Sequence, residues 1–204
     1  MPDMKKYDLI LDALQQLLEE RKIQNISVSE IAQKAGIGKG SIYYYFPSKE
    51  AILDALVRRS YEKPIQTAKA LAMQTDIAPF TRMAMLFQAC RNSSAAFLSQ
   101  NGSTPNTSVQ DLAFLHQKYL NHVISELKPE LTEIIKQGIA CGDIHFDYPA
   151  ALAEIVLIVI AVKLDNSLVT STPEELEDTL KGLISLLEKG TDVAPGSLSY
   201  LSFF

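Results

Sequence analysis

Residues 27–50, SVSEIAQKAGIGKGSIYYYFPSKE, decide the fold of this chain. Ser27 and Glu30 form a capping-box pattern, in which each side chain accepts a hydrogen bond from the other residue's backbone N–H, so a helix is predicted to begin there. Gly36 is expected to end that helix, because glycine supplies the backbone freedom of a sharp turn. Residues 38–45 then predict a second short helix at a steep angle to the first. The segment is therefore interpreted as a helix-turn-helix.

A third helix follows the motif directly. Pro47 disfavours the α conformation at Phe46, and Ser48 can cap a helix that starts at Lys49. Upstream of the motif, apolar residues at spacings of one, three and four predict an amphipathic helix over residues 5–20. That helix is expected to form the floor under the two motif helices.

The same residues resemble the N-terminal DNA-binding domain of the TetR family of bacterial transcriptional repressors. The resemblance rests on the AG turn at 35–36, on KGSIYYYF at 39–46 and on PSKE at 47–50, and it covers roughly the first third of the chain. It implies an N-terminal three-helix helix-turn-helix domain, which we place at residues 3–63. A larger helical domain for effector binding and dimerisation is implied for residues 64–204.

The predicted reading helix offers few side chains to bases. In a helix-turn-helix the first turn of the second helix faces base edges in the major groove. Lys39 and Ser41 are the residues of that turn whose side chains can hydrogen-bond, and Lys39 suits guanine O6 and N7 or a phosphate. Gly40 has no side chain and lets the protein backbone come close to the DNA.

The three consecutive tyrosines are expected to have different contacts. Tyr43 and Tyr45 are two residues apart and cannot share one helix face with Tyr44. By the resemblance, Tyr43 and Tyr45 point to phosphates, whereas Tyr44 packs inward with Phe46.

Helix starts supply the remaining predicted contacts. Lys49 and Ser27 lie at helix N-termini, where exposed N–H groups favour anions, and Ser29 is a weaker candidate beside Ser27. A serine in such a position can also serve only as a cap. The full set of predicted DNA-binding residues is Ser27, Ser29, Lys39, Gly40, Ser41, Tyr43, Tyr45 and Lys49.

Positive charge is concentrated in the same region. The whole chain has a net charge of −5, which argues against non-specific binding to polyanions. Residues 21–60, however, hold seven basic side chains against three acidic ones. This asymmetry is typical of a protein that touches DNA with one end.

The rest of the chain predicts a second helical domain. At 204 residues, 47% of them hydrophobic, the chain can bury a second core. Helical patterns recur through residues 50–189 without alternating strand patterns, so the fold class is all-α. Pro64 is expected to end or bend its helix, which places the domain joint there. Further helices are predicted at 79–98, 110–127 and 129–142, with the uncharged loop SQNGSTPNTS at 99–108.

Five residues are candidates for lining an effector pocket: Phe87, Cys90, His116, Tyr119 and His122. They are polar or polarizable groups on otherwise apolar helices, as adaptable ligand sites use. Ordinary core or surface positions are the alternative for each. The two histidines are six residues apart, so no metal site is expected. Both cysteines are isolated and are expected to remain reduced thiols.

Two helices near the C-terminus are predicted to form a dimer interface. Residues 149–169 contain the apolar run 155–162, which is too short for a membrane span and must be covered on all sides. Residues 173–189 follow a capping box, TPEE at 172–175, and carry leucines that step by four, three and four. Two such helices from each of two chains make a four-helix bundle, which matches how TetR-like proteins dimerise; a bundle within one chain is the alternative. The end of the tail 191–204 alternates polar and apolar residues, which leaves two possibilities open, a strand-like strap or docking against the partner.

These features predict a cytoplasmic, homodimeric transcriptional regulator that binds a palindromic double-stranded DNA operator, as a repressor. By the resemblance, a small-molecule effector stabilises a conformation whose reading helices are wrongly spaced and so releases the DNA. The chain shows no nucleophile with a base, no paired carboxylates and no phosphate loop, so it is not expected to be an enzyme or to use a cofactor. No membrane contact is expected either. The alternative is a constitutive DNA-binding regulator or adaptor without an effector.

Overall fold

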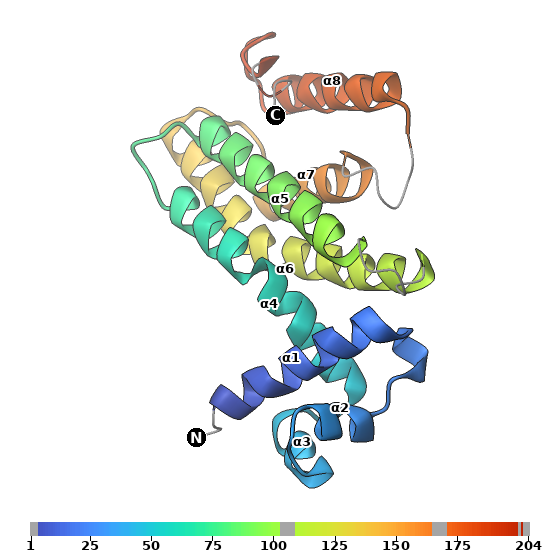
Figure 1. Cartoon of the computed structure of the whole chain (residues 1–204). Helices are drawn as coiled ribbons and strands as arrows, with labels where there is room; N and C mark the ends of the chain where they lie inside the picture. Colours follow the sequence, from blue (N-terminus) through green and yellow to red (C-terminus); the bar gives the residue numbers. More distant parts are fainter. Residues whose placement is uncertain (1–3, 103–108, 165–170, 200, 202–204) are drawn as a thin grey trace. The chain divides into compact units, whose positions relative to one another are not determined.

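The computed structural model describes residues 4–102, 109–164, 171–199 and 201. Regular structure among these residues is helical and includes no strand, which confirms the all-α prediction. The chain divides into two compact units, coloured along the sequence in Figure 1. The first unit contains Met1–Glu62 and Ala96–Tyr119, and the second contains Lys63–Ala95 and Leu120–Phe204. The domain boundaries expected from the sequence, 3–63 and 64–204, remain a prediction.

Short helices make up the N-terminal part of the first unit. They are α1 (Met4–Glu20), the 3-10 helix η1 (Ile23–Asn25), α2 (Val28–Lys34) and α3 (Lys39–Tyr45). α1 contacts α2, and α2 contacts α3, as the blue helices of Figure 1 show. Side chains without solvent exposure form the core of this region: Ile10, Ile31, Ile42 and Ile52. The predicted amphipathic helix and the two helices of the motif are thereby confirmed.

The turn between α2 and α3 has the geometry that the motif requires. Gly36 has a φ of 68°, in the left-handed region that favours glycine. The Ile37 amide donates to the Ala32 carbonyl at 3.0 Å and closes the turn. α3 then begins after Gly38, whose backbone is extended and which has no side chain for a cap.

The fourth helix, α4, spans Lys49–Ala72 and continues through Pro64. Proline removes one helical hydrogen bond and crowds the preceding turn. Buried side chains before and after it, Tyr61 and Ile65, offset that cost. α4 therefore does not end at Pro64, because packing outweighs the local cost of proline; a bend at Pro64 stays a prediction.

A second proline is accommodated in α6, which spans Val109–Cys141 and contains Pro129. Leu127 and Leu131, two residues on either side, are 0% exposed and anchor both halves of the helix. The Thr132 hydroxyl donates to the Lys128 carbonyl of the preceding turn at 2.7 Å. The separate helices predicted at 110–127 and 129–142 are therefore one helix.

The fifth helix, α5, spans Pro79–Gly102 and enters the segment that we expected to be a loop. Residues 99–102 are helical, so the loop prediction is wrong there. Serine and asparagine disfavour a helix only weakly, and a helix that is already formed can extend over them. The remainder of the predicted loop, 103–108, lies outside the described residues.

The last helices are α7 (Pro149–Ile158), the π-helical turn η2 (Val159–Leu164) and α8 (Pro173–Gly190). The predicted capping box at the start of α8 is confirmed, because the Glu175 amide donates to Thr172 Oγ1 at 3.3 Å and the Thr172 amide donates to the Glu175 carboxylate at 2.9 Å. The helix predicted at 149–169 is described as far as Leu164. Among the described residues, no helix is long and apolar enough to cross a lipid bilayer.

The C-terminal tail folds back on α8. The buried Glu188 accepts a hydrogen bond from the Leu198 amide at 2.9 Å. Bonds from the backbone amides of Gly196 and Leu198 hold the pKa of Glu188 below its ordinary value. Leu198 and Leu201 are buried, and their spacing of three suits a turn of 3-10 helix. The described part of the tail is therefore not a strand, and docking against a partner stays a prediction.

Candidate nucleic-acid interface

The α3 helix presents polar and aromatic side chains to solvent. It is anchored by Ile42, which is 0% exposed. Lys39, Ser41 and Tyr43 are exposed. Among the described residues, Lys39 makes no ion pair or side-chain hydrogen bond, so its ammonium group remains available to a ligand. The residues predicted to contact base edges are thus solvent-exposed.

Gly40 lies between these side chains on the first turn of α3. A Cβ atom added at Gly40 would meet nothing within 4 Å. The protein's own packing therefore does not require glycine at this position. The open space beside it fits the prediction that the backbone comes close to DNA there.

The structure corrects the expected position of Tyr44. Its side chain is 69% exposed, whereas Phe46 is buried and its ring lies tilted against that of Tyr7 of α1, with ring centroids 4.8 Å apart. Ile42 and Phe46 are four residues apart and share the buried side of the chain, so Tyr44, midway between them, points elsewhere. Tyr44 meets the half-buried Tyr45 edge-on at 5.2 Å. Tyr44 is thus a candidate contact that the sequence interpretation missed, although the spacing of Ile42 and Phe46 could have revealed it.

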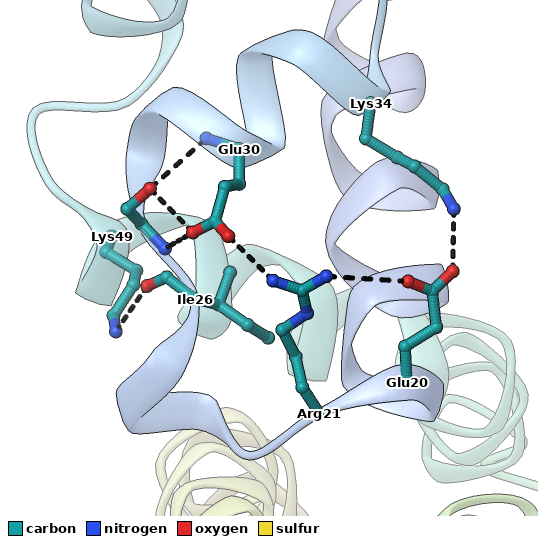
Figure 2. A network of polar contacts seen from close by, with 7 residues as sticks. Glu20, Arg21, Ile26, Glu30, Lys34 and Lys49 are labelled. Atoms are coloured by element: carbon teal, nitrogen blue, oxygen red, sulfur yellow. Dashed lines mark hydrogen bonds and ion pairs between the residues drawn. The ribbon is translucent and has the colours of Figure 1, made fainter.

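The start of α2 is fixed by the predicted capping box. The Glu30 amide donates to Ser27 Oγ at 3.2 Å, and the Ser27 amide donates to Glu30 Oε2 at 2.8 Å. Figure 2 shows the Glu30 carboxylate between this turn and Arg21, whose guanidinium donates to Glu30 Oε1 at 2.7 Å. Hydrogen bonds from the Ser27 side chain and then its backbone lower the pKa of Glu30. Ser27 and Ser29 both remain exposed.

A second polar contact joins the ends of α1 and α2. Lys34 Nζ donates to Glu20 Oε1 at 2.7 Å, and Arg21 lies 4.0 Å from the same carboxylate (Figure 2). The bond from Lys34 and its charge lower the pKa of Glu20. These side chains are solvent-exposed, and exposed ion pairs each contribute little to stability. They join the end of α1 to the end of α2 at the protein surface.

Lys49 begins α4, and its side chain returns towards η1 and α2. Its Nζ atom donates to the carbonyl oxygens of Ile23 and Ile26, each at 2.8 Å. Figure 2 shows the bond to Ile26 below the capping box. The side chain is half-buried. In the DNA-free protein, the ammonium group predicted to hold a phosphate is thus bound to backbone carbonyls.

Comparison with known proteins joins both parts of the chain to one family. Residues 10–56 match the family described as "Bacterial regulatory proteins, tetR family", and residues 98–183 match the "Tetracyclin repressor-like, C-terminal domain". The chain belongs to the TetR family. The resemblance seen in the N-terminal motif is thereby confirmed and extended to the C-terminal part.

Relatives of this TetR-family chain match it to different extents. The HTH-type transcriptional regulator EthR of Mycobacterium tuberculosis (strain CDC 1551 / Oshkosh) is 41% identical over 63 residues, which make up 31% of this chain and only 29% of EthR. The fatty acid metabolism regulator protein of Bacillus subtilis (strain 168) is 28% identical over 159 residues, 72% of this chain and 75% of that protein. The crystal structure of RolR with its ligand resorcinol aligns with a TM-score of 0.61 at 16% identity, covering 98% of this chain and 93% of RolR, a likeness of fold alone.

The residues predicted to line an effector pocket in this TetR-family chain lie in both units. In the first unit, His116 and Tyr119 are each 1% exposed, and their rings stack at 5.7 Å. In the second unit, Phe87 is buried and His122 is half-buried. The side chain of Cys90 lies outside the described residues. The structure thus brings His116 and Tyr119 together, and the pocket itself remains a prediction.

The last helices of this TetR-family chain expose several apolar side chains to solvent. Ile155 and Ile158 of α7 are 56% and 46% exposed, and Leu186 of α8 is 71% exposed. Leu183 and Leu187, which we expected in a seam between chains, are buried within the single chain. The exposed apolar surface of these helices therefore consists of Ile155, Ile158 and Leu186, and not of the leucines predicted to form the seam.

Proposed function

We propose that this chain is a transcriptional regulator that binds double-stranded DNA in the cytoplasm with α3 in the major groove. The observation that carries the proposal is the orientation of α3, whose side chains Lys39, Ser41 and Tyr43 are exposed while Ile42 anchors the helix in the core. A major groove admits one α-helix, and a helix of seven residues presents its first turns to base edges.

The exposed residues of α3 suit distinct contacts. Lys39 and Ser41 are assigned to base edges, with Gly40 allowing the backbone to approach. Tyr43 is assigned to a phosphate through its hydroxyl group. Tyr44, exposed next to it, is assigned to the groove wall, where an aromatic ring can contact a thymine methyl group or a sugar.

Phosphate contacts beside the groove complete the proposed site. Ser27 and Ser29 are exposed at the start of α2, and the half-buried Tyr45 is the last residue of α3. Side chains of these types commonly bond phosphate oxygens and set the register of a protein on a duplex. Together with the local excess of basic residues, they favour binding at this end of the protein.

The proposed regulator acts as a homodimer on a palindromic operator. One helix of seven residues reads few bases, whereas a two-fold pair reads two half-sites about one helical turn apart. The exposed Ile155, Ile158 and Leu186 give α7 and α8 an apolar surface that a second copy would cover. The dimer is therefore assigned to residues 149–169 and 173–189.

We further propose that a small molecule relieves repression by this regulator. An effector shifts a protein between conformations only by its difference in affinity for them, so it must bind better to the form that does not fit the operator. RolR, which shares the fold, binds resorcinol in its crystal structure, and a relative is named for fatty acid metabolism. A fatty acid and a simple phenol are therefore reasonable first probes.

Selection from random duplex DNA tests the proposal. We expect the full chain to enrich a palindromic sequence and to bind it with two chains per duplex, as measured by analytical ultracentrifugation. Tyr43→Phe, which removes only a hydroxyl group, should weaken binding alike on all selected sequences. If no sequence is enriched over the starting pool, the DNA-binding function is wrong. If DNA is bound but neither probe nor a wider metabolite panel changes affinity, the regulator is constitutive.

A further inference from the structure

One arginine of the second unit is buried without a counter-charge. Arg82, in the first turn of α5, is 2% exposed. Its Nη1 atom donates to the carbonyl oxygen of Ala72, the last residue of α4, at 2.8 Å, and to Gln137 Oε1 of α6 at 2.7 Å. Both acceptors are neutral groups. Among the residues that the structure describes, Arg82 forms no ion pair.

The carboxylates nearest to Arg82 in the sequence or in its contacts do not supply the missing charge. Asp76, between α4 and α5, is exposed and forms no ion pair with Arg82. Glu133 is also exposed and accepts a hydrogen bond from Gln137 Nε2 at 3.2 Å, so it reaches the guanidinium only through a neutral amide group. The partial negative charge at the end of α4 offsets part of the cost of burial. A full counter-charge is still missing, and buried charges in proteins are normally paired.

The helices around Arg82 are closely packed. Gly138, which follows Gln137, brings α6 close to the start of α5. A Cβ atom added at Gly138 would lie 3.2 Å from Pro79 Cβ and 2.6 Å from Ile144 Cδ1. The guanidinium group is therefore held in a well-packed part of the second unit, where a hydrogen bond is electrostatically stronger than in water.

The donors that remain on Arg82 fit one chemical group. A guanidinium has five N–H donors, and Nη1 directs its two to Ala72 and Gln137. The Nε atom is buried and has no hydrogen-bond partner in the described part of the chain. No bond from Nη2 to a described residue is present either. Nε and Nη2 donate in parallel from one edge of the planar group, and that edge matches the two oxygens of a carboxylate.

We propose that Arg82 is the binding residue for an organic carboxylate, which accepts hydrogen bonds from Nε and Nη2 while Ala72 and Gln137 hold the other side of the guanidinium. The ligand supplies the counter-charge that the described residues lack. The proposal names a chemical class for the effector proposed above, and its consequence for DNA rests on that proposed function. The binding itself does not depend on DNA.

Titration of the full chain with acids in the absence of DNA tests the binding. The probes are formate, butyrate, octanoate and benzoate, each compared with its amide, a neutral molecule of similar shape. At least one acid should bind about tenfold or more tightly than its amide, as measured by calorimetry, because the amide cannot accept two charge-assisted bonds. The same acid should shift the Nε–H NMR signal of Arg82. If no acid shifts that signal, or if the amide shifts it equally, the proposal is overturned.

A pair of variants tests which arginine binds the acid. Arg82→Gln keeps an amide donor but removes the charge and the paired donors, so it should weaken binding of the tightest acid by about tenfold or more. Arg59→Gln is the matched control, because the Arg59 guanidinium already donates to Asp12 Oδ1 at 2.7 Å and to Gln15 Oε1 at 2.9 Å. It should bind the acid as the wild type does. Undiminished binding in Arg82→Gln would overturn the proposal, and if that variant does not fold, the NMR titration of the wild type decides.

A second titration separates the binding site from its consequence for DNA. The acid that binds most tightly is added to the complex with the selected palindromic duplex, and affinity for the duplex is expected to fall in the wild type and not in Arg82→Gln. If the acid binds but leaves DNA affinity unchanged in the wild type, Arg82 binds a carboxylate and the effector role is wrong. If the wild type selects no DNA, the proposed function fails, and the titration without DNA still decides whether Arg82 binds the acid.

Discussion

Two helices of this protein, α2 and α8, begin with the same four-residue capping box and differ in length. At α2 the box is formed by Ser27 and Glu30, with bonds of 3.2 and 2.8 Å. At α8 it is formed by Thr172 and Glu175, with bonds of 3.3 and 2.9 Å. The local geometry is nearly the same. What differs is the helix behind each box, since α2 has 7 residues and α8 has 18.

The difference shows how a short helix is stabilised by contacts outside itself. Isolated helices shorter than about 12 residues are marginal in water, so α2 cannot rely on its own hydrogen bonds. It buries only Ile31 and Ala32, and it is joined to its surroundings by the contacts of Glu30 and Lys34 in Figure 2. α8 is more than twice as long and buries Leu183, Ile184 and Leu187 in its C-terminal half. Damage at α2 should therefore spread to α3, whereas damage at α8 should stay local.

The largest expected effect comes from the core side chain of α2. Ile31→Ala removes one of its two buried side chains and should destabilise the first unit by about 2–5 kcal/mol, abolishing DNA binding. Urea unfolding followed by circular dichroism measures this, because the chain has no tryptophan for fluorescence. Leu186→Ala on the open side of α8, 71% exposed, is the matched control and should leave the stability of a single chain unchanged. An equal loss in the free energy of unfolding in both variants would contradict the difference proposed between α2 and α8.

The two capping boxes can be compared directly by removing one hydroxyl group from each. Ser27→Ala and Thr172→Ala should each cost about 1 kcal/mol of helix stability, the usual value for a removed cap. Only Ser27→Ala is expected to increase hydrogen exchange in the neighbouring α3, because α2 and α3 contact each other. Exchange that rises throughout the second unit in Thr172→Ala would show that α8 depends on its cap as much as α2 does.

Acid should destabilise the capping box at the start of α2, and substituting Glu30 should remove this pH dependence. Folding lowers the pKa of Glu30 from its ordinary value of 4.5, chiefly through the Ser27 hydroxyl. Its contribution to stability is therefore present above that value and is lost as pH falls through the lowered pKa. Unfolding midpoints measured from pH 6 to pH 3 should fall less steeply in Glu30→Gln than in the wild type. If the midpoints of the two proteins fell in parallel with pH, protonation of Glu30 would not contribute to the loss of stability in acid.

The smallest effect is expected on the surface of α8. Lys181 and Glu177 form an exposed pair at 2.6 Å, one helical turn apart. Exposed pairs of this kind contribute little, because water and salt screen them. Glu177→Gln should leave the urea midpoint unchanged within error and should not alter DNA binding. A measurable loss would mean that polar contacts also stabilise the long helix.

Local patterns predicted the features that local chemistry controls. Both capping boxes and the turn at Gly36 follow from residues within a few positions of each other, so the sequence alone revealed them. The helices continue through Pro64 and Pro129 because buried neighbours, which no local pattern shows, offset the cost of proline. The helical residues 99–102 illustrate the same point, since weak propensities yield to an established helix.

The candidate site was predictable in its composition and less so in its geometry. Lys39, Ser41 and Tyr43 lie exposed on α3 as their positions in the motif suggest. Tyr44 was placed inside by the family resemblance, whereas the spacing of Ile42 and Phe46 excludes it from that side. The bonds from Lys49 to η1 link residues more than 20 positions apart and have no signature in the sequence.

The central claim is that the exposed face of α3 binds DNA, and one titration tests it most directly. Fluorescence anisotropy of the selected palindromic duplex should be measured with the wild type and with Lys39→Met at several salt concentrations. The account predicts saturation at two chains per duplex, an affinity that falls steeply with salt, and a smaller salt slope for Lys39→Met. A wild type that binds the palindrome no better than a scrambled duplex, or a Lys39→Met slope equal to that of the wild type, would contradict it.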